Sequence, residues 1–308
     1  MKSDRAFPLS AALAALGAAV LFGASTPLAK ALLHDLSPVL LAGLLYLGSG
    51  AGLVLIRLVR DRGWRKPKMT KQEWLWLLLA ILFGGMLGPV LLMFGLVRTP
   101  AATASLLLNL EAVLTALIAW IVFHENANRR IVLGFALIVA GAILLALPGS
   151  SQHLGLGHGA LLIAGACLCW ALDNNFTCRV SRSDALFIAG MKGWVAGIVN
   201  TAIAIGLGAR FPSVPIVGMA LGVGLLGYGI SLVLFVLALR GVGSARTGAY
   251  FSTAPFIGAA IAILAFGDHA SWVFWIAAVL MGAGVWLHLT ERRGHLGDAD
   301  RTHDVQHT

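Results

Sequence analysis

The sequence predicts an all-helical integral membrane protein of ten transmembrane helices, arranged as two inverted repeats of five helices. Three observations lead to this fold class. The chain of 308 residues is 59% apolar and only 11% charged, with a mean hydropathy of +0.88, whereas soluble domains carry about 25% charged residues. Its apolar residues form segments long enough to cross a bilayer, and its second half repeats the pattern of the first.

Ten apolar segments reach the length of roughly 20 residues that a spanning helix requires. Backbone polar groups cannot stay unpaired in hydrocarbon, and the alternating pattern of barrel strands is absent, so these segments are predicted to be helices. The first segment is too long for the core of a signal peptide and is interpreted as a retained span. The predicted spans are 8–32, 37–58, 74–97, 101–123, 130–148, 157–177, 184–207, 214–238, 246–267 and 271–290.

The basic residues predict the orientation of these spans. With the N-terminus in the cytoplasm, most Lys and Arg residues lie on the cytoplasmic side, and Lys30, Arg98 and Arg210 lie outside. This bias follows the positive-inside rule, and it predicts cytoplasmic N- and C-termini in a bacterial inner (plasma) membrane. The net charge of +9 is therefore interpreted as a topology signal and a contact for lipid headgroups, not as a nucleic-acid-binding surface.

A repeat relates the two halves of the chain. Ala112 starts an apolar run that leads to Glu125 thirteen residues later, and Pro255 starts a similar run that leads to Asp268 thirteen residues later. The first half holds an odd number of spans, so the second half is expected to enter the membrane from the opposite side. Secondary transporters have this architecture, with a substrate site near the midplane between the repeats.

The repeat also predicts the domain boundaries. Gly141 and Gly284 keep the offset of 143 residues that relates Ala112 to Pro255, so the repeat extends into the following span. We expect a first repeat over 1–148 and a second over 149–290. The remaining segment, 291–308, is polar and is expected to be a disordered cytoplasmic tail.

Both repeats resemble the EamA domain of the drug/metabolite transporter superfamily. The resemblance rests on LEAVLTALIAWIVFHE followed by RIVLGFALIVAGAILL in the first half, and on TAPFIGAAIAILAFGD followed by FWIAAVLMGAGVWL in the second. Phe22 and Trp170 occupy matching places in the first helix of each repeat, and Lys30 follows Phe22. Ala112 stands where the family usually has proline, so the helix bend at this point is expected to be lost in the first repeat.

The resemblance implies a secondary transporter that exports small metabolites, and among ten-span bacterial members the chain is most similar to amino-acid exporters. The small-molecule substrate and the bilayer are the expected partners, with protons as a coupling ion or facilitated diffusion as the alternative. A lipid flippase or a carrier of another metabolite class remains open. The sequence has no Walker motif, no HExxH and no GxSxG, so neither an ATP-driven pump nor an intramembrane enzyme is expected. No metal or organic cofactor is expected.

Charged residues inside spans need a specific role because each costs roughly 2.5–3.5 kcal/mol at the bilayer centre on insertion scales. Glu111 lies midway along the fourth predicted span, with Asn109 close to it. Glu111 is a candidate for binding a substrate ammonium or a coupling proton, and equally for a structural role. Lys192, in the seventh span, is a candidate partner of Glu111 or of a substrate carboxylate; its alternative is to extend toward the cytoplasmic surface.

Polar and aromatic residues of the second half complete the candidate pathway. Asp173, Asn174 and Asn175 form a polar run that either lines the inner mouth of the pathway or ends the sixth span. Aromatic rings can stack on an apolar or aromatic substrate, and four are candidates for such a role: Trp170, Trp194, Tyr228 and Tyr250.

Two further acidic residues, Glu125 and Asp268, lie at helix ends and are interpreted as loop anchors. Charges of both signs together with aromatic faces suit an amino acid better than a nucleotide sugar, whose diphosphate would need several basic residues.

Overall fold

The computed structural model describes residues 9–63, 69–123, 129–147, 157–180 and 184–287. Every regular element in these ranges is a helix. Within these described ranges, nine helices are long and apolar enough to cross a membrane, and a shorter apolar helix, Trp272–Leu287, follows them. The predicted all-helical membrane fold is confirmed. Glu125 and the predicted cytoplasmic tail lie outside the described residues.

The helices follow the predicted spans in order. They are α1 (Leu9–Leu32), α2 (Pro38–Asp61), α3 (Lys71–Ala80), η1 (Ile81–Leu87), α4 (Gly88–Arg98), α5 (Ala101–Leu107), α6 (Leu110–Phe123), α7 (Arg129–Ala146), α8 (His158–Arg179), α9 (Ala185–Gly206), α10 (Val214–Gly224), η2 (Leu225–Ile230), α11 (Ser231–Val242), α12 (Ser244–Phe251) and α13 (Ala254–Phe266).

The third and eighth spans each contain a π-helical segment at their middle. In the third span, η1 separates α3 from α4, and in the eighth span η2 separates α10 from α11. Pro89 has no N–H, so it cannot donate the helical hydrogen bond to the carbonyl of Gly85, and the helix widens before it. The sequence pattern predicted the two spans but not the π-helical segments within them.

The fourth and ninth spans are each broken by a two-residue turn, at Leu108–Asn109 and at Ser252–Thr253. The expectation that the bend is lost in the first repeat is therefore wrong. Asn109 Nδ2 donates to the carbonyl of Leu106 at 2.9 Å, and Thr253 Oγ1 donates to the carbonyl of Tyr250 at 2.6 Å. Such side-chain bonds three residues back compete with the helical pattern, so Asn109 maintains the break without proline.

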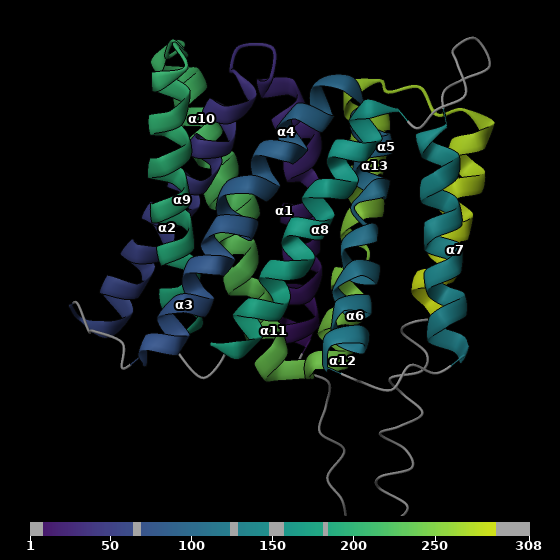
Figure 1. Cartoon of the computed structure of the whole chain (residues 1–308), viewed down its shortest axis with the longest axis horizontal. Coiled ribbons are helices and arrows are strands. Elements are labelled where there is room, and N and C mark those ends of the chain that lie inside the picture. Colours follow the sequence, from purple (N-terminus) through teal and green to yellow (C-terminus); the bar gives the residue numbers. More distant parts are fainter. Residues whose placement is uncertain (1–8, 64–68, 124–128, 148–156, 181–183, 288–308) are drawn as a thin grey trace, which may run out of the picture.

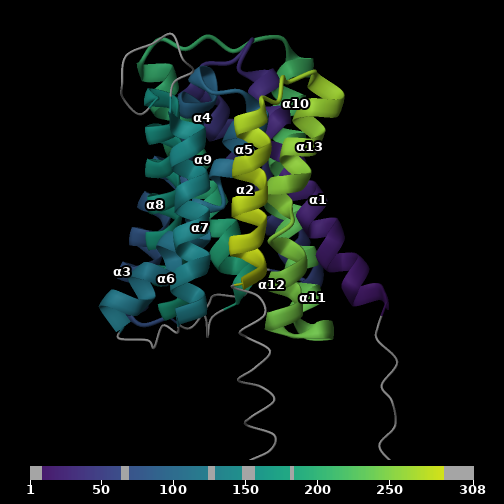
Figure 2. The same ribbon diagram turned by 90° about the vertical axis from the view of Figure 1, so that its right-hand side faces the viewer.

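The corresponding pieces of the two halves run in opposite directions. In Figure 1, α5 lies at the top and α6 at the bottom, whereas α12 lies at the bottom and α13 at the top. Figure 2 shows that α1 begins and Trp272–Leu287 ends at the same, lower end of the bundle. This arrangement is that of an inverted repeat with an even number of spans.

Glycine lets helices of opposite halves approach closely. A Cβ atom on Gly193 of α9 would lie 2.5 Å from the Cα of Gly50 in α2, and one on Gly197 would lie 2.5 Å from the backbone nitrogen of Leu47. Small residues of this kind let membrane helices pack backbone to backbone. The α2–α9 pair (Figure 1) therefore holds Tyr46 of α2 and Lys192 of α9 in fixed positions.

The last helix of each half forms a second glycine-mediated pair. A Cβ atom on Gly141 of α7 would lie 2.8 Å from Met281 Cγ, and one on Gly284 would lie 2.6 Å from the carbonyl of Gly134. Figure 1 shows α7 beside the helix Trp272–Leu287 at the edge of the bundle. Gly141 and Gly284, which the repeat made equivalent, therefore lie in one interface.

Candidate functional site

An ion pair inside the bundle is the centre of the candidate site. Lys192 Nζ of α9 lies 2.6 Å from Oδ1 and 2.5 Å from Oδ2 of Asp173 in α8. Their side chains are 17% and 7% exposed. Thr177 Oγ1 donates to Asp173 Oδ1 at 2.9 Å, so Asp173 has a second partner. Charges in hydrocarbon are tolerated when they are paired in this way.

The ion pair corrects two readings of the sequence. Lys192 pairs with Asp173 and does not extend to the end of the bundle. The run from Asp173 to Asn175 is not a polar helix end, because α8 continues to Arg179 and both Asp173 and Asn175 are buried.

The π-helical segment η1 lies against this ion pair. Gly84 of η1 is so close to Asp173 that a Cβ atom at this position would overlap the carboxylate. The carbonyl of Gly84 accepts hydrogen bonds from Tyr46 Oη at 2.7 Å and Trp170 Nε1 at 3.0 Å. Asn200 Nδ2 lies 3.4 Å from the next carbonyl, that of Gly85. The carbonyls of η1 thus bind side chains of α2, α8 and α9 in place of regular helical partners.

Glu111 lies in the first turn of α6, directly after the helix break, near the middle of its span. Asn174 Nδ2 of α8 donates to Glu111 Oε1 at 2.9 Å and lies 3.2 Å from Thr115 Oγ1. Asn175 Nδ2 lies 3.3 Å from the carbonyl of Thr115. Glu111 is therefore bound by Asn174, and the charges of Asp173 and Lys192 act on it electrostatically.

An aromatic cluster extends from the ion pair toward the second half. The rings of Tyr46 and Tyr228 have centroids 5.7 Å apart, and Tyr228 packs edge-on against Phe22 at 6.0 Å. Phe22 contacts Phe251 at 5.3 Å, and Phe251 contacts Phe235 at 4.9 Å. The contacts of Phe22 with Tyr228 and of Phe235 with Phe251 are edge-to-face, an arrangement that aromatic rings favour. The cluster joins α1, α2, η2, α11 and α12.

The structure brings together most of the residues that the sequence singled out. Glu111, Asn174, Asp173, Lys192 and Trp170 form one connected set through the contacts above, and Tyr228 joins it through Tyr46. The other members of the site do not stand out in the sequence: Tyr46, Asn200 and the carbonyl of Gly84 in the polar centre, and Phe22, Phe235 and Phe251 in the aromatic cluster. Tyr46 is one of only three tyrosines in the chain, which is a signal that sequence reasoning could have used.

Four other candidates lie elsewhere or have structural contacts. Asn109 is buried at the helix break, where it bonds to backbone. Tyr250 lies on α12, but its neighbour Phe251 is the residue whose ring joins the aromatic cluster. Trp194 is 37% exposed at the surface of the bundle. Asp268 Oδ2 accepts from the backbone N–H of Ala102 at 2.8 Å, so it anchors the first turn of α5.

The two helix breaks lie close together beside α1, since α5 and α13 are in direct contact. The space between them is too narrow for a water molecule, and its lining consists of Phe22, Gly23, Thr26, Ser105, Leu108, Ala254 and Pro255. Broken helices at the interface of two repeats are where secondary transporters bind their substrates. The breaks, the ion pair and the aromatic cluster therefore occupy the place in the fold where a transport pathway is expected.

Comparison with known proteins agrees with this architecture. A relative from Methanothermobacter thermautotrophicus, described as an uncharacterized transporter, is 29% identical over 286 residues, which cover 88% of this chain and 83% of that protein. A probable amino-acid metabolite efflux pump from Salmonella typhimurium is 29% identical over 171 residues, 54% of this chain and 53% of the pump. A solved crystal structure with 20% sequence identity superposes with a TM-score of 0.66, covering 92% of this chain and 98% of the other.

The family comparison covers both halves. The EamA-like transporter family matches residues 9–147 and, separately, residues 157–290. Membership in a transporter family implies a small-molecule substrate and a lipid environment, and it agrees with the many apolar helices of membrane length. The chain is a multi-pass inner-membrane transporter, and it belongs to the EamA-like transporter family.

Proposed function

We propose that this transporter exports small zwitterionic metabolites, with amino acids as the substrate class, by alternating access between the two repeats. The observation that carries this proposal is the ion pair of Asp173 and Lys192, which are 2.5 Å apart inside the bundle. It offers one group of each sign to a substrate that itself carries one group of each sign.

The energetics of buried charges explain why such a pair suits a zwitterion. Removing one partner of a buried ion pair costs about 3–5 kcal/mol, because the other charge is left without compensation. A substrate amine or a substrate carboxylate alone would compensate only one of Asp173 and Lys192. An amino acid supplies both charges, so it can separate Asp173 from Lys192 while each finds a new partner.

The aromatic residues beside the ion pair favour substrates with an apolar or aromatic side chain. Trp170 and Tyr46 both donate to the carbonyl of Gly84, so their rings are held in fixed orientations next to Asp173. Tyr228 extends this wall toward the second repeat. Rigid aromatic rings provide contact area at a low cost in side-chain entropy.

Glu111 is the proposed coupling site for protons. It is the acidic residue that directly follows the break in the fourth span, and Asn174 binds one of its oxygens. A rearrangement that separates α6 from α8 would break the bond to Asn174 and change the surroundings of the carboxylate. Proton binding and helix movement would then be linked, as antiport requires.

Counterflow in proteoliposomes tests the substrate class. Vesicles with purified protein are loaded with unlabelled phenylalanine, and labelled phenylalanine, phenethylamine or 3-phenylpropionate is added outside. Accumulation of phenylalanine well above that of the amine and the acid is expected. Equal accumulation of the amine would contradict a role for both charges, and accumulation of none of the three would exclude this substrate class and direct the next assay to lipid substrates.

The same assay tests the residues. Asp173→Asn and Lys192→Met are each expected to lower counterflow at least about ten-fold, which corresponds to the loss of about 1.4 kcal/mol. Asp35→Asn is the matched control, because Asp35 is an exposed carboxylate between α1 and α2. Glu111→Gln should keep exchange but remove the response to a pH gradient. Elution as a single species in size-exclusion chromatography shows which variants are folded.

A further inference from the structure

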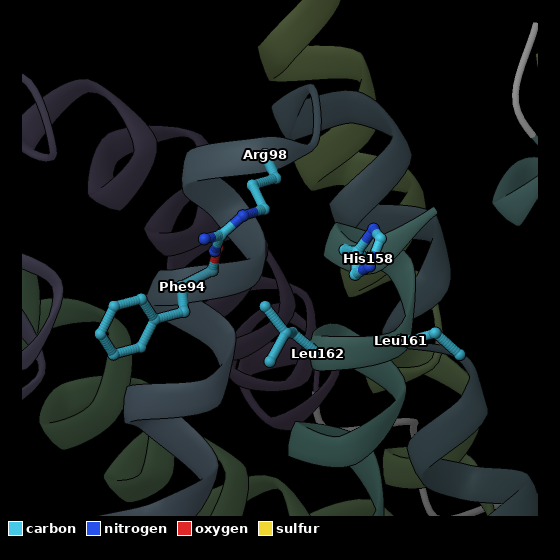
Figure 3. Close-up of a pocket in the computed structure, with 5 residues that line it drawn as sticks. All are labelled: Phe94, Arg98, His158, Leu161 and Leu162. Atoms are coloured by element: carbon cyan, nitrogen blue, oxygen red, sulfur yellow. The ribbon is translucent and has the colours of Figure 1, made fainter. Parts of the chain in front are cut away.

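A pocket lies at the start of α8, at the other end of this helix from the ion pair. It has a volume of about 420 Å³ and is lined by Phe94 and Arg98 of α4 and by His158, Leu161 and Leu162 of α8. Figure 3 shows the guanidinium of Arg98 and the ring of His158 on opposite sides of the pocket, with Leu162 between and below them. The lining is therefore cationic and polar at one level and apolar below.

The pocket is separated from the transport pathway by a tight helix contact. A Cβ atom on Gly95 of α4 would lie 2.6 Å from Ile163 Cγ1 and 3.0 Å from the carbonyl of Gly159 in α8. Ile163 itself is fully buried. Since α4 and α8 are in contact behind the pocket, an occupant enters from the bilayer surface and not from the centre of the bundle.

The position of the pocket along the helices matches the membrane interface. Arg98 is the last residue of α4, and His158 is the first residue of α8. Leu161 is 50% exposed, so the apolar part of the pocket is open to lipid. Polar groups at a helix end above exposed apolar side chains correspond to a headgroup above acyl chains.

Charge identifies the kind of occupant. Arg98 Nη1 donates to the carbonyl of Phe94 at 3.2 Å, and a guanidinium has further N–H groups with the geometry to bind phosphate. The nearby cation Lys30 donates to the carbonyls of Leu96 and Val97, so it caps α4 and leaves Arg98 as the cation that lines the pocket. His158 adds an imidazole ring whose nitrogens can form hydrogen bonds.

We propose that this pocket binds an anionic phospholipid, with its phosphate against Arg98 and His158 and its first acyl carbons against Leu161, Leu162 and Phe94. The site is independent of the proposed substrate site. A lipid bound here would bridge α4 of the first repeat and α8 of the second. The helix α4 directly follows η1, and α8 carries Asp173. The lipid composition of this leaflet would thereby affect how the two repeats move.

Native mass spectrometry of the full-length protein tests the proposal. The protein is released from nanodiscs that contain equal amounts of phosphatidylglycerol and phosphatidylcholine with identical acyl chains, and the retained lipids are counted. Preferential retention of one phosphatidylglycerol is expected. Arg98→Gln should lower this preference about five-fold, because a basic residue near a membrane surface contributes about 1 kcal/mol toward an anionic lipid. Arg98→Lys, which keeps the charge, should fall between the two.

Two matched controls separate this pocket from general effects. Arg210→Gln removes an exposed cation from the loop between α9 and α10, and it should leave the preference unchanged. Leu162→Ala should weaken retention of both lipids, whereas Leu168→Ala, an exposed leucine elsewhere on α8, should not. An equal loss in Arg210→Gln would show that only overall charge matters and would overturn the proposal.

Two further results would also overturn it. If phosphatidylcholine is retained as well as phosphatidylglycerol in the wild type, the pocket is only an apolar groove. If millimolar inorganic phosphate removes the retained phosphatidylglycerol, and labelled phosphate binds in an Arg98-dependent way without lipid, the ligand is a free anion. Counterflow of phenylalanine is not expected to distinguish these cases, so the substrate proposal stands or falls separately.

Discussion

Gly84 of η1 lies directly against the carboxylate of Asp173, which occupies the place that a methyl group on residue 84 would need. The contact joins the π-helical segment of the first repeat to the charged centre of the second. Only glycine at this position leaves Asp173 free to reach Lys192. The ion pair therefore depends on the backbone of a helix that carries no charge itself.

Gly84→Ala is expected to disrupt the Asp173–Lys192 pair. The added Cβ atom would overlap Asp173, and overpacking inside a tight contact typically costs about 1–3 kcal/mol. Phenylalanine counterflow should fall, together with the resistance of the protein to unfolding in SDS. Gly222→Ala is the control, because a Cβ atom at Gly222 meets nothing within 4 Å. Normal counterflow in Gly84→Ala would show that the ion pair tolerates displacement.

Apolar segments predict the spans well because each span has to match the bilayer by itself. The third span illustrates both the success and its limit. Its sequence predicts a helix over 74–97, and the structure has one continuous span from Lys71 to Arg98. The π-helical segment inside it was not predicted, since it depends on which side chains of other helices bind its carbonyls.

The candidate site, too, could be predicted only in part from the sequence. Glu111, Asp173 and Lys192 stand out in the sequence because charge inside an apolar span is costly. Their partners depend on helix rotation: Lys192 faces Asp173 nineteen residues earlier in the chain, and Glu111 faces Asn174. Sequence spacing within one helix cannot specify a contact between α8 and α6. Tyr46 was missed because its role comes from the carbonyl of Gly84 on another helix.

The break in the fourth span depends on a polar side chain and not on proline. Asn109→Leu removes the donor that bonds to the carbonyl of Leu106, and leucine favours a continuous helix. We expect slower transport and slower exchange of the amide hydrogens at 108–110, measured by hydrogen–deuterium exchange with mass spectrometry. Leu114→Ala, one turn inside α6, is the control. Unchanged exchange in Asn109→Leu would indicate that tertiary packing alone maintains the break.

Asp268 is expected to contribute to stability through the start of α5. Its carboxylate accepts the N–H of Ala102 at 2.8 Å, and loss of a side-chain acceptor at a helix N-terminus costs about 0.5–2 kcal/mol. Asp268→Ala should lower the free energy of unfolding by this amount. Asp35→Ala, which removes an exposed carboxylate between α1 and α2, should have little effect. Equal losses in both variants would point to a general charge effect.

Asp184, just before α9, predicts a pH dependence of stability. Burial raises the pKa of its carboxyl, but hydrogen bonds from the Arg60 guanidinium and the N–H of Leu186 outweigh this and hold the pKa below its usual value. A lowered folded-state pKa gives stability that is present above the unfolded pKa of about 3.9 and is lost as pH falls through the folded value.

Asp184→Ala should therefore be less stable than the wild type at pH 7, and the difference should shrink as the pH falls below about 4. Thermal unfolding in detergent at several pH values measures it. Arg60→Gln tests whether the ion pair causes this pH dependence, because removal of the guanidinium should remove much of the same pH-dependent difference. A constant difference between wild type and Asp184→Ala at all pH values would show that the ionised carboxylate contributes no stability, and it would contradict this prediction.

The carbonyl of Gly84 predicts that two aromatic residues depend on each other. It accepts from Tyr46 Oη at 2.7 Å and from Trp170 Nε1 at 3.0 Å, so either donor alone still satisfies it. Tyr46→Phe and Trp170→Phe should each cost little through this carbonyl, whereas the double variant leaves the buried carbonyl without either donor. A buried carbonyl without a donor costs about 1–3 kcal/mol. The stability lost in the double variant should therefore exceed the sum of the losses in the two single variants. SDS unfolding of the four proteins measures this coupling, with Tyr228→Phe in place of Tyr46→Phe as the control cycle. Strict additivity would mean that the π-helical carbonyl has another donor once both are removed.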